Sequence, residues 1–210
     1  MGSEIVVRRA EVADRDALIA AFARAAVDEP AIAWVMAGSP VDGFVDGYVP
    51  EVIDRALATD EIWVAGVEAE IWTVSIWQHV TSTERFFAEA AEAQGFAEAM
   101  PDMQVLRRAA IATRLQADQH PTSFPHRYLQ IIVTVPEHRG KGSGAALVAD
   151  RTAAAAAARS SAFLEASSAQ SARLYARYGF VAEPRTHTLP EGGPTLRPMW
   201  YRPVIDAATR

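Results

Sequence analysis

Residues 128–158 read YLQIIVTVPEHRGKGSGAALVADRTAAAAAA, an apolar strand, a glycine-rich turn and an alanine-rich helix in direct succession. Residues 128–135 favour a strand, and Pro136 ends it because proline has no N–H for a sheet ladder. The alternating glycines Gly140, Gly142 and Gly144 indicate a turn with unusual backbone angles. A helix that starts there directs unpaired N–H groups and a positive dipole end into the turn. The stretch therefore predicts an anion site, and phosphate fits it best.

Three kinds of phosphate-binding loop can be compared with this turn. A P-loop is excluded, because it needs glycine where Val135 stands and Ser or Thr where Gly142 stands. A dinucleotide fingerprint is matched by Gly140, Gly142 and Ala145, with Glu165 20 residues further on. However, the strand ends too far before the first glycine, and only 45 residues follow Glu165. The third candidate is R-x-x-G-x-G after a strand, and an ordinary glycine-rich loop is the alternative to all three.

The R-x-x-G-x-G pattern is carried by Arg139, Gly142 and Gly144. It resembles the pyrophosphate loop of the GNAT superfamily, the acyl-CoA-dependent N-acyltransferases. A second segment, LEAS at 164–167 followed by LYARYGF at 174–180, is similar to the strand and helix that come after the CoA helix in that superfamily. The resemblance is strong over about residues 128–181.

Length and composition place the chain in a broad class. With 210 residues it is predicted to form a single domain, residues 1–210. Its net charge of −6 and its lack of a basic run argue against nucleic acid as a partner. It has no cysteine, which excludes disulfides and suits a reducing cytoplasm. We find no signal peptide and no apolar run of membrane-spanning length, so we expect a cytoplasmic protein without a membrane partner.

Periodicity and turn residues predict the order β-α-α-β-β-α-α-β-α-β-α-β-β, an α/β protein with a mixed sheet. Asp14 is the expected N-cap of a first helix, and Pro30 is expected to end it. Pro198 is expected to place the last strand at an edge or a bulge. The resemblance implies a mostly antiparallel sheet flanked by helices, with an enlarged helical insertion at 83–118 before the central strand. We expect this insertion to line an acceptor pocket or to form a homodimer contact.

The resemblance also implies acetyl-CoA as the co-substrate. Two neighbouring strands should splay, so that freed backbone groups of the central strand hold the pantetheine arm while the turn holds the pyrophosphate. Arg139 and Lys141 should add positive charge near the phosphates, and solvated surface charge is the alternative explanation for both. Ser168 stands where many members have Asn, and Ser171 lies near a second hydrogen-bonding position of the family. A serine hydroxyl can still donate to a pantetheine carbonyl or a phosphate, but it has a shorter reach than an asparagine side chain. The predicted cofactor-binding residues are Ile132, Val133, Thr134, Arg139, Gly140, Lys141, Gly142, Ser143, Gly144, Ala145, Ser168 and Ser171.

Acyl transfer to an amine needs a proton donor for the departing thiolate. Tyr175 matches the family position of this general acid, and a phenol with a pKa of about 10 stays protonated at neutral pH. Glu165 is the candidate base, and the alternatives are a structural carboxylate or no dedicated base at all. Each residue also has a purely structural explanation: Tyr175 as a packed aromatic side chain and Glu165 as a carboxylate that caps a nearby turn. Asp28, Glu29 and residues 75–79 are further candidates for acceptor contacts.

The predicted function is an N-acetyltransferase that moves an acetyl group from acetyl-CoA to a primary amine of a small molecule or peptide. The five histidines show no paired metal-ligand spacing, so no metal site is predicted. A CoA-binding regulatory module without catalysis is the first alternative, and a Rossmann-type oxidoreductase is the second.

Overall fold

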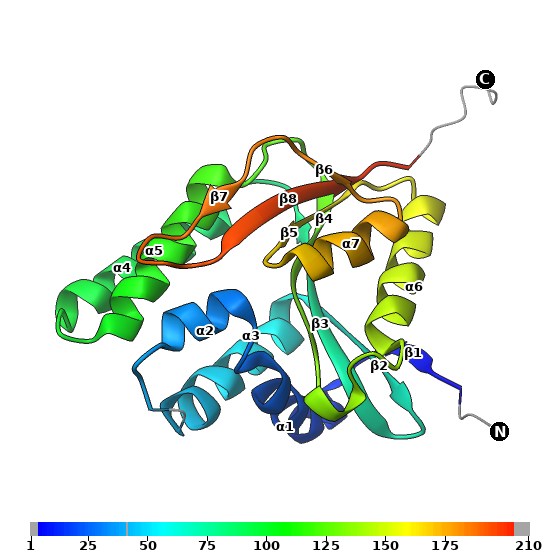
Figure 1. The fold of residues 1–210 in the computed structure, drawn as a ribbon, viewed down its shortest axis with the longest axis horizontal. Coiled ribbons are helices and arrows are strands. Elements are labelled where there is room, and N and C mark those ends of the chain that lie inside the picture. Colours follow the sequence, from blue (N-terminus) through cyan, green and yellow to red (C-terminus); the bar gives the residue numbers. More distant parts are fainter. Residues whose placement is uncertain (1–3, 41, 204–210) are drawn as a thin grey trace.

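A computed structural model describes residues 4–40 and 42–203. Its eight strands form one sheet in the order β1-β2-β3-β4-β5-β8-β6, with β7 paired to β8 (Figure 1). Only β4 and β5 are parallel among the described pairs, and the others are antiparallel. The mixed and mostly antiparallel sheet is therefore confirmed, and a doubly wound Rossmann sheet is excluded. The strands are β1 Val6–Arg9, β2 Glu61–Val67, β3 Glu70–Val80, β4 His126–Thr134, β5 Ala162–Ala166, β6 Val181–Ala182, β7 His187–Thr188 and β8 Thr195–Tyr201.

Helices cover both faces of the sheet. Figure 1 shows helices α1 to α3 on one side of β2 and β3 and helix α6 on the other side. The pair α4 and α5 forms the predicted insertion before the central strand β4. Apolar residues that recur at helical spacing turn one face of a helix to the sheet, as Leu18, Phe22 and Ala25 of α1 do. The helices are α1 Arg15–Ala26, α2 Pro30–Met36, α3 Val49–Thr59, α4 Glu84–Ala99, α5 Gln104–Gln119, α6 Ser143–Ala157 and α7 Ala169–Arg177, with a π-helical turn at Gly43–Tyr48 and 3-10 turns at Val12–Asp14 and Pro136–His138.

The buried residues divide according to these two faces. Ile131 and Val133 of β4 pack in the cluster under α1 and α3. Leu129 packs in the cluster under α6 and α7, with Val148 and Tyr175. Side chains of a regular strand alternate between faces, so residues 129 and 131 should share one. They do not, because the register of β3 and β4 shifts between these two residues. Ile131 pairs with Ile76 and Leu129 pairs with Trp77, the next residue of β3, so Gln130 is an extra residue on β4.

Two helix-end predictions were wrong. Pro30 does not end a helix but begins α2, because the first position of a helix needs no N–H partner. Asp14 precedes α1 but makes no side-chain cap. Its carboxylate instead accepts from Arg8, at 2.7 Å, and from the backbone N–H of Glu11, at 2.8 Å. A charged partner outside the helix outcompetes the cap, since a charge-assisted bidentate pair is stronger than one neutral donor.

The C-terminal strands also differ from expectation. The single strand expected after Gly179 is replaced by the two short strands β6 and β7. Strand β8 is not at the edge, because β5 pairs with it on one side and β6 on the other. The carbonyl of Pro198 accepts from Glu183 N–H at 2.9 Å, on the β6 side of the strand. The proline nitrogen faces the same side, beyond the end of β6, so its missing N–H interrupts no ladder.

Candidate active site

The strands β4 and β5 separate halfway along their length. They pair only between Arg127–Leu129 and Ala162–Leu164. Beyond this point β4 continues with β3, and β5 continues with β8. The backbone groups of Gln130–Thr134 that face β5 therefore have no strand partner, although backbone groups in a sheet are normally paired. The predicted residues Ile132, Val133 and Thr134 lie along this opening.

The turn before α6 has the geometry of an anion site. Gly140 and Gly142 have φ angles of 77° and 95°, in the left-handed region that favours glycine. Gly142 is the residue that precedes the helix, and no side chain caps it. Among the described residues, the N–H groups of 142–145 find no protein acceptor. Four free donors at the positive end of a 15-residue helix suit a diphosphate.

The side chain of Ser143 has a structural task. It is 1% exposed, and its hydroxyl lies 2.7 Å from the hydroxyl of Thr73 on β3. That hydroxyl is in turn 2.9 Å from the hydroxyl of Thr134 on β4. This chain of three hydroxyls fixes the first turn of α6 against both strands. Ser143 can therefore contribute its backbone N–H to a ligand, whereas its side chain is occupied.

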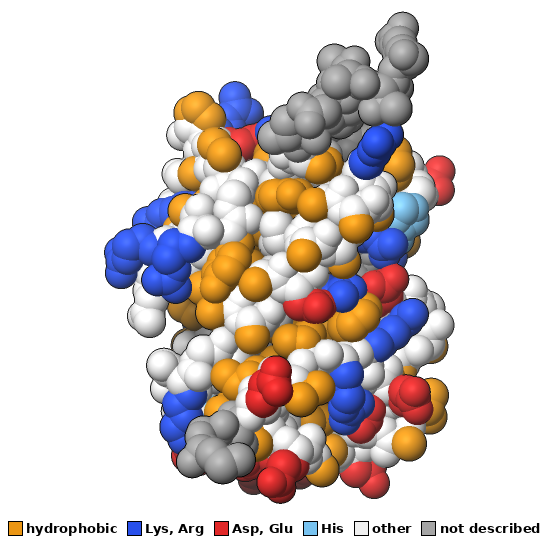
Figure 2. Space-filling model, turned by 90° about the vertical axis from the view of Figure 1, so that its right-hand side faces the viewer, with side chains coloured by type: hydrophobic (Ala, Val, Ile, Leu, Met, Phe, Trp, Pro, Cys, Tyr) orange, Lys and Arg blue, Asp and Glu red, His pale blue; other side chains and the backbone are white. Residues whose placement is uncertain are grey.

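The two basic side chains of the turn lie in different surroundings. The guanidinium of Arg139 forms a bidentate pair with Asp28, at 2.6 Å and 2.7 Å. The ammonium of Lys141 lies over the ring of Trp72, 5.5 Å from its centroid, and near His138 Nδ1. Figure 2 views the molecule from the side on which α6 lies in Figure 1, and it shows basic and acidic side chains interspersed with apolar ones.

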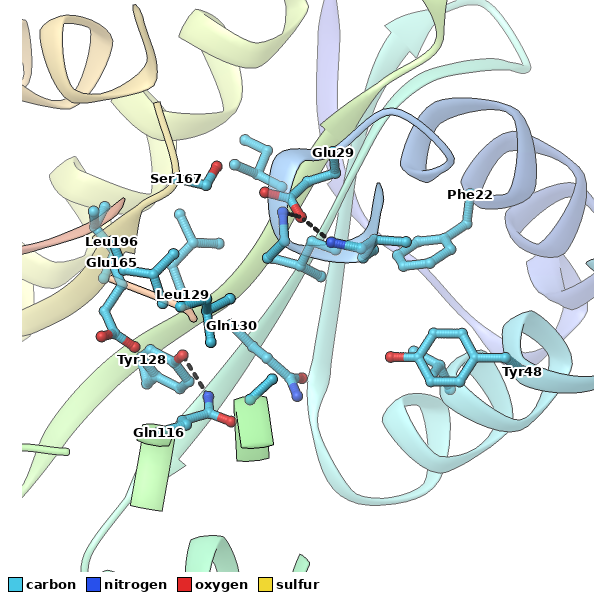
Figure 3. A pocket seen from close by; sticks show the side chains of 18 of the residues that line it. Phe22, Glu29, Tyr48, Gln116, Tyr128, Leu129, Gln130, Glu165, Ser167 and Leu196 are labelled. Atoms are coloured by element: carbon cyan, nitrogen blue, oxygen red, sulfur yellow. Dashed lines mark hydrogen bonds between the residues drawn. The ribbon is translucent and has the colours of Figure 1, made fainter. Parts of the chain in front are cut away.

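A cavity of about 210 Å³ opens between the separating strands and the helices α1, α2, α3 and α5. Figure 3 shows its lining from close by. Helix α5 of the insertion contributes Ala112 and Gln116, so this insertion does line the pocket. Residues 75–79, which were candidates for acceptor contacts, do not line it. The lining includes Phe22, Glu29, Tyr48, Arg55, Gln116, Tyr128, Gln130, Glu165, Ser167, Tyr175, Leu189 and Leu196.

Tyr175 reaches this cavity from α7. Its side chain is 6% exposed and packs beside Phe180, with ring centroids 6.0 Å apart. Burial raises the pKa of the phenol, and the nearby charge of Glu29 raises it further. The hydroxyl is therefore fully protonated at neutral pH, as a proton donor must be.

Glu165 reaches the cavity from β5, on the face that it shares with Phe163. Burial raises the pKa of its carboxyl to about 7, and no hydrogen bond to it is found among the described residues. Figure 3 shows it beside Tyr128, whose hydroxyl accepts a hydrogen bond from Gln116 Nε2 at 2.6 Å. A carboxyl with a pKa close to neutral can take up and release protons at physiological pH.

Glu29 is a second carboxylate in the cavity, and its position follows from the start of α2. Its Oε2 accepts from the N–H groups of Ala31 and Ile32, at 2.9 Å and 3.0 Å. The sequence signal was the pair Glu29-Pro30, an N-cap followed by proline at the first helical position. Because Pro30 was interpreted as a helix end, that signal was missed. The other oxygen of Glu29 has no hydrogen bond to the described residues.

Ser168 and Ser171 form a reciprocal cap at the start of α7. The hydroxyl of Ser168 accepts from Ser171 N–H at 3.1 Å, and the hydroxyl of Ser171 accepts from Ser168 N–H at 3.2 Å. Their side chains are thus already engaged with each other and with the helix end. Ser167, which was not predicted, lines the cavity instead.

Two further features are absent from the described part of the chain. Between residues 4–40 and 42–203, no group of three or more His, Asp or Glu side chains is arranged to hold a metal ion. Within the same ranges, no helix combines the length and the apolar character needed to cross a membrane.

Comparison with known proteins gives a consistent result. The family model for the acetyltransferase (GNAT) domain matches residues 58–182, more than half of the chain. A crystal structure described as histone acetyltransferase HPA2 and related acetyltransferase, from Corynebacterium glutamicum, is 23% identical. Its TM-score is 0.68, and the match covers 98% of this chain and 99% of the other.

Two insect enzymes have the same fold. The polyamine N-acetyltransferase of Drosophila melanogaster matches with a TM-score of 0.68 at 18% identity, and the match covers 95% of this chain and 100% of the other. Arylalkylamine N-acetyltransferase 2 from Aedes aegypti matches with a TM-score of 0.67 at 15% identity, covering 95% of this chain and 99% of its own. At these identities the likeness concerns the fold.

Proposed function

The chain belongs to the GNAT acetyltransferase family, and from this premise we propose that it transfers an acetyl group from acetyl-CoA to the primary amine of a small molecule. One arrangement carries the proposal. The free N–H groups before α6, the unpaired backbone of β4 and the cavity that contains Tyr175 follow one another along the same opening. This order matches a cofactor with a diphosphate, an amide-bearing arm and a thioester at its end.

The proposed cofactor site consists mainly of backbone. N–H groups of residues 142–145 would hold the diphosphate, aided by the positive end of α6. Groups on the open side of Ile132–Thr134 would pair with the amides of the arm in the manner of an added strand. Lys141 would add a positive charge near the phosphates. No metal is needed for any of these contacts.

The proposed acceptor site is the cavity. Its lining holds two acidic side chains, Glu29 and Glu165, against one basic side chain, Arg55, and this excess of acidic groups suits an amine that arrives as a cation. The aromatic lining of Phe22, Tyr48 and Tyr128 suits the carbon skeleton of such an amine. The insect relatives are named for polyamines and arylalkylamines, which fit the same chemistry. A peptide terminus is the alternative acceptor.

The proposed chemistry is direct attack of the neutral amine on the thioester carbonyl. Tyr175 would protonate the departing thiolate, because its hydroxyl stays protonated at neutral pH until the thiolate forms. The amine must lose a proton before it attacks. Glu165, with its pKa of about 7, is the proposed acceptor of this proton, and Glu29 is the competing candidate on the same cavity.

Thiol release tests the proposal. Free CoA should appear when the protein is incubated with acetyl-CoA and a panel of diamines, arylalkylamines and peptides. Acetyl-CoA alone should raise the melting temperature, because it binds only the folded state. A raised melting temperature without turnover of any amine would favour the alternative, a CoA-binding module without catalysis. No shift and no thiol release would contradict both functions.

A further inference from the structure

The side chain of Arg139 is turned toward the helices of the acceptor side. Besides its two bonds to Asp28, its Nε donates to the carbonyl of Thr134 at 3.0 Å. One terminal nitrogen also donates to the carbonyl of Ala25 at 3.4 Å. A guanidinium has five N–H groups in a fixed fork, and these contacts use most of them. Little donor capacity remains for a phosphate.

These contacts join three segments that are distant in sequence. Ala25 belongs to the last turn of α1, Asp28 to the connection before α2, and Thr134 to the end of β4. The guanidinium lowers the pKa of Asp28 through its hydrogen bonds, so the carboxylate stays ionised. Arg139 thus fixes the α1–α2 connection to the strand that borders the cofactor opening.

The next residue after Asp28 is Glu29, the carboxylate that begins α2 and lines the cavity. Glu29 is held by two bonds to its own helix, at 2.9 Å and 3.0 Å, so the placement of α2 decides where its carboxylate lies. The connection that places α2 is in turn held by Asp28 and Arg139.

We propose that Arg139 is a positioning residue for the acceptor site, and that it acts through Asp28 on Glu29. The inference rests on the proposed function for its kinetic readout. It differs from the expected role, in which the Arg139 side chain binds the phosphates of CoA. The two roles make opposite predictions for a variant that removes Asp28.

The central experiment compares Asp28→Asn, Arg139→Gln and the double variant. If Arg139 positions Glu29, each single change should lower kcat/KM for the amine by about fivefold or more, because both remove the bidentate pair and Arg139→Gln also removes the bonds to Thr134 and Ala25. The double variant should be no worse than Arg139→Gln alone, because Asp28→Asn then removes no further interaction. Acetyl-CoA affinity, measured by calorimetry without turnover, should stay within about twofold.

A phosphate role for Arg139 would give the reverse pattern. Asp28→Asn would release the guanidinium and tighten acetyl-CoA binding, whereas Arg139→Gln would weaken it with little effect on the amine. Either result would overturn the inference, as would unchanged amine kinetics in both variants. Because the calorimetric arm needs no turnover, it separates a wrong role for Arg139 from a wrong proposed function.

The chain provides a matched control nearby. Arg24 of α1 pairs with Glu137 of the same loop at 2.8 Å, and in the described part of the chain no hydrogen bond or ion pair joins either residue to Asp28 or Glu29. Arg24→Gln removes a comparable exposed ion pair between α1 and the loop. It should therefore leave the amine kcat/KM unchanged. If Arg24→Gln lowered the amine kcat/KM as much as Arg139→Gln does, Arg139 would only stabilise the loop, and the inference would be overturned.

Discussion

The two halves of the opening, the turn before α6 and the cavity beyond it, are built by different means. The turn is one continuous stretch, and its free hydrogen-bond donors are the backbone N–H groups of residues 142–145. The cavity is lined by side chains from α1, α2, α3, α5, β4, β5 and α7. A site made of backbone depends on φ and ψ angles, whereas a site made of side chains depends on how distant elements pack.

The two halves also differ in charge. Helix α6 offers a positive dipole end to the turn, and the turn itself carries the exposed Lys141. The cavity is lined by the two acidic side chains Glu29 and Glu165 and by one basic side chain, Arg55. An anionic cofactor and a cationic acceptor would thus each meet the opposite sign, which would keep them from exchanging places. Changes in one half should therefore affect one substrate and spare the other.

The largest effect on kcat is expected from Tyr175, which lies where the cofactor half and the acceptor half of the opening meet. Tyr175→Phe removes one hydroxyl and keeps the ring beside Phe180. General acid catalysis is worth about 10²–10⁴-fold, so kcat should fall by an amount in this range. Acetyl-CoA affinity and melting temperature should hardly change. Rapid-quench measurement of the acetylated amine checks this, and a kcat equal to that of the unmodified protein would remove Tyr175 from the acid role.

The next effect should be confined to the turn. Gly142→Asp places a side chain at a φ of 95° and a negative charge among the free N–H groups. Backbone strain there costs about 1–3 kcal/mol, and repulsion of the diphosphate adds to it. Acetyl-CoA affinity should fall by at least about tenfold in calorimetry. Gly95→Asp adds the same charge within α4, with open space around it, and is the control. Equal affinities in both variants would place the cofactor elsewhere.

The smallest effect should be confined to the cavity and should depend on pH. With a pKa of about 7, the ionised fraction of Glu165 rises about tenfold between pH 6 and pH 8, and kcat/KM for the amine should rise with it. Glu165→Gln should abolish this limb. A limb that persists in the Gln variant, at the same pH, would transfer the base role to Glu29 or to solvent.

Unfolding provides an independent check of that pKa. The folded pKa of Glu165 lies above its ordinary value, so the folded state binds the proton more tightly than the unfolded chain does. This contribution is complete below the unfolded pKa and is lost as pH rises toward about 7. The Gln variant, which needs no proton, should therefore gain melting temperature relative to the unmodified protein at pH 8 but not at pH 4.

Sequence reasoning was strongest where the site is local. The strand, the turn and α6 follow one another, and their glycines already imply left-handed angles, which Gly140 and Gly142 have. Tyr175 and Glu165 were paired by motif, and both line one cavity. Their chemical roles remain predictions.

The same reasoning could not place groups that meet through tertiary packing. Arg139 and Asp28 are 111 residues apart, and no local pattern shows that they form an ion pair. Ser143 was predicted as a cofactor-binding residue, and no local pattern reveals that its hydroxyl lies against Thr73, 70 residues away. Pro30 was misread for another reason, since proline is compatible with both the end and the start of a helix.

The extra residue in β4 serves the cavity and not the two apolar clusters. Leu129 faces α6 and α7, and Ile131 faces α1 and α3, as two adjacent residues of a regular strand would. A deletion of Gln130 would therefore leave both clusters as they are and Thr134 beside Thr73. It would remove the bulge and one side chain from the lining of the cavity. Homologous chains that lack this residue should keep the fold and differ in the shape of the cavity.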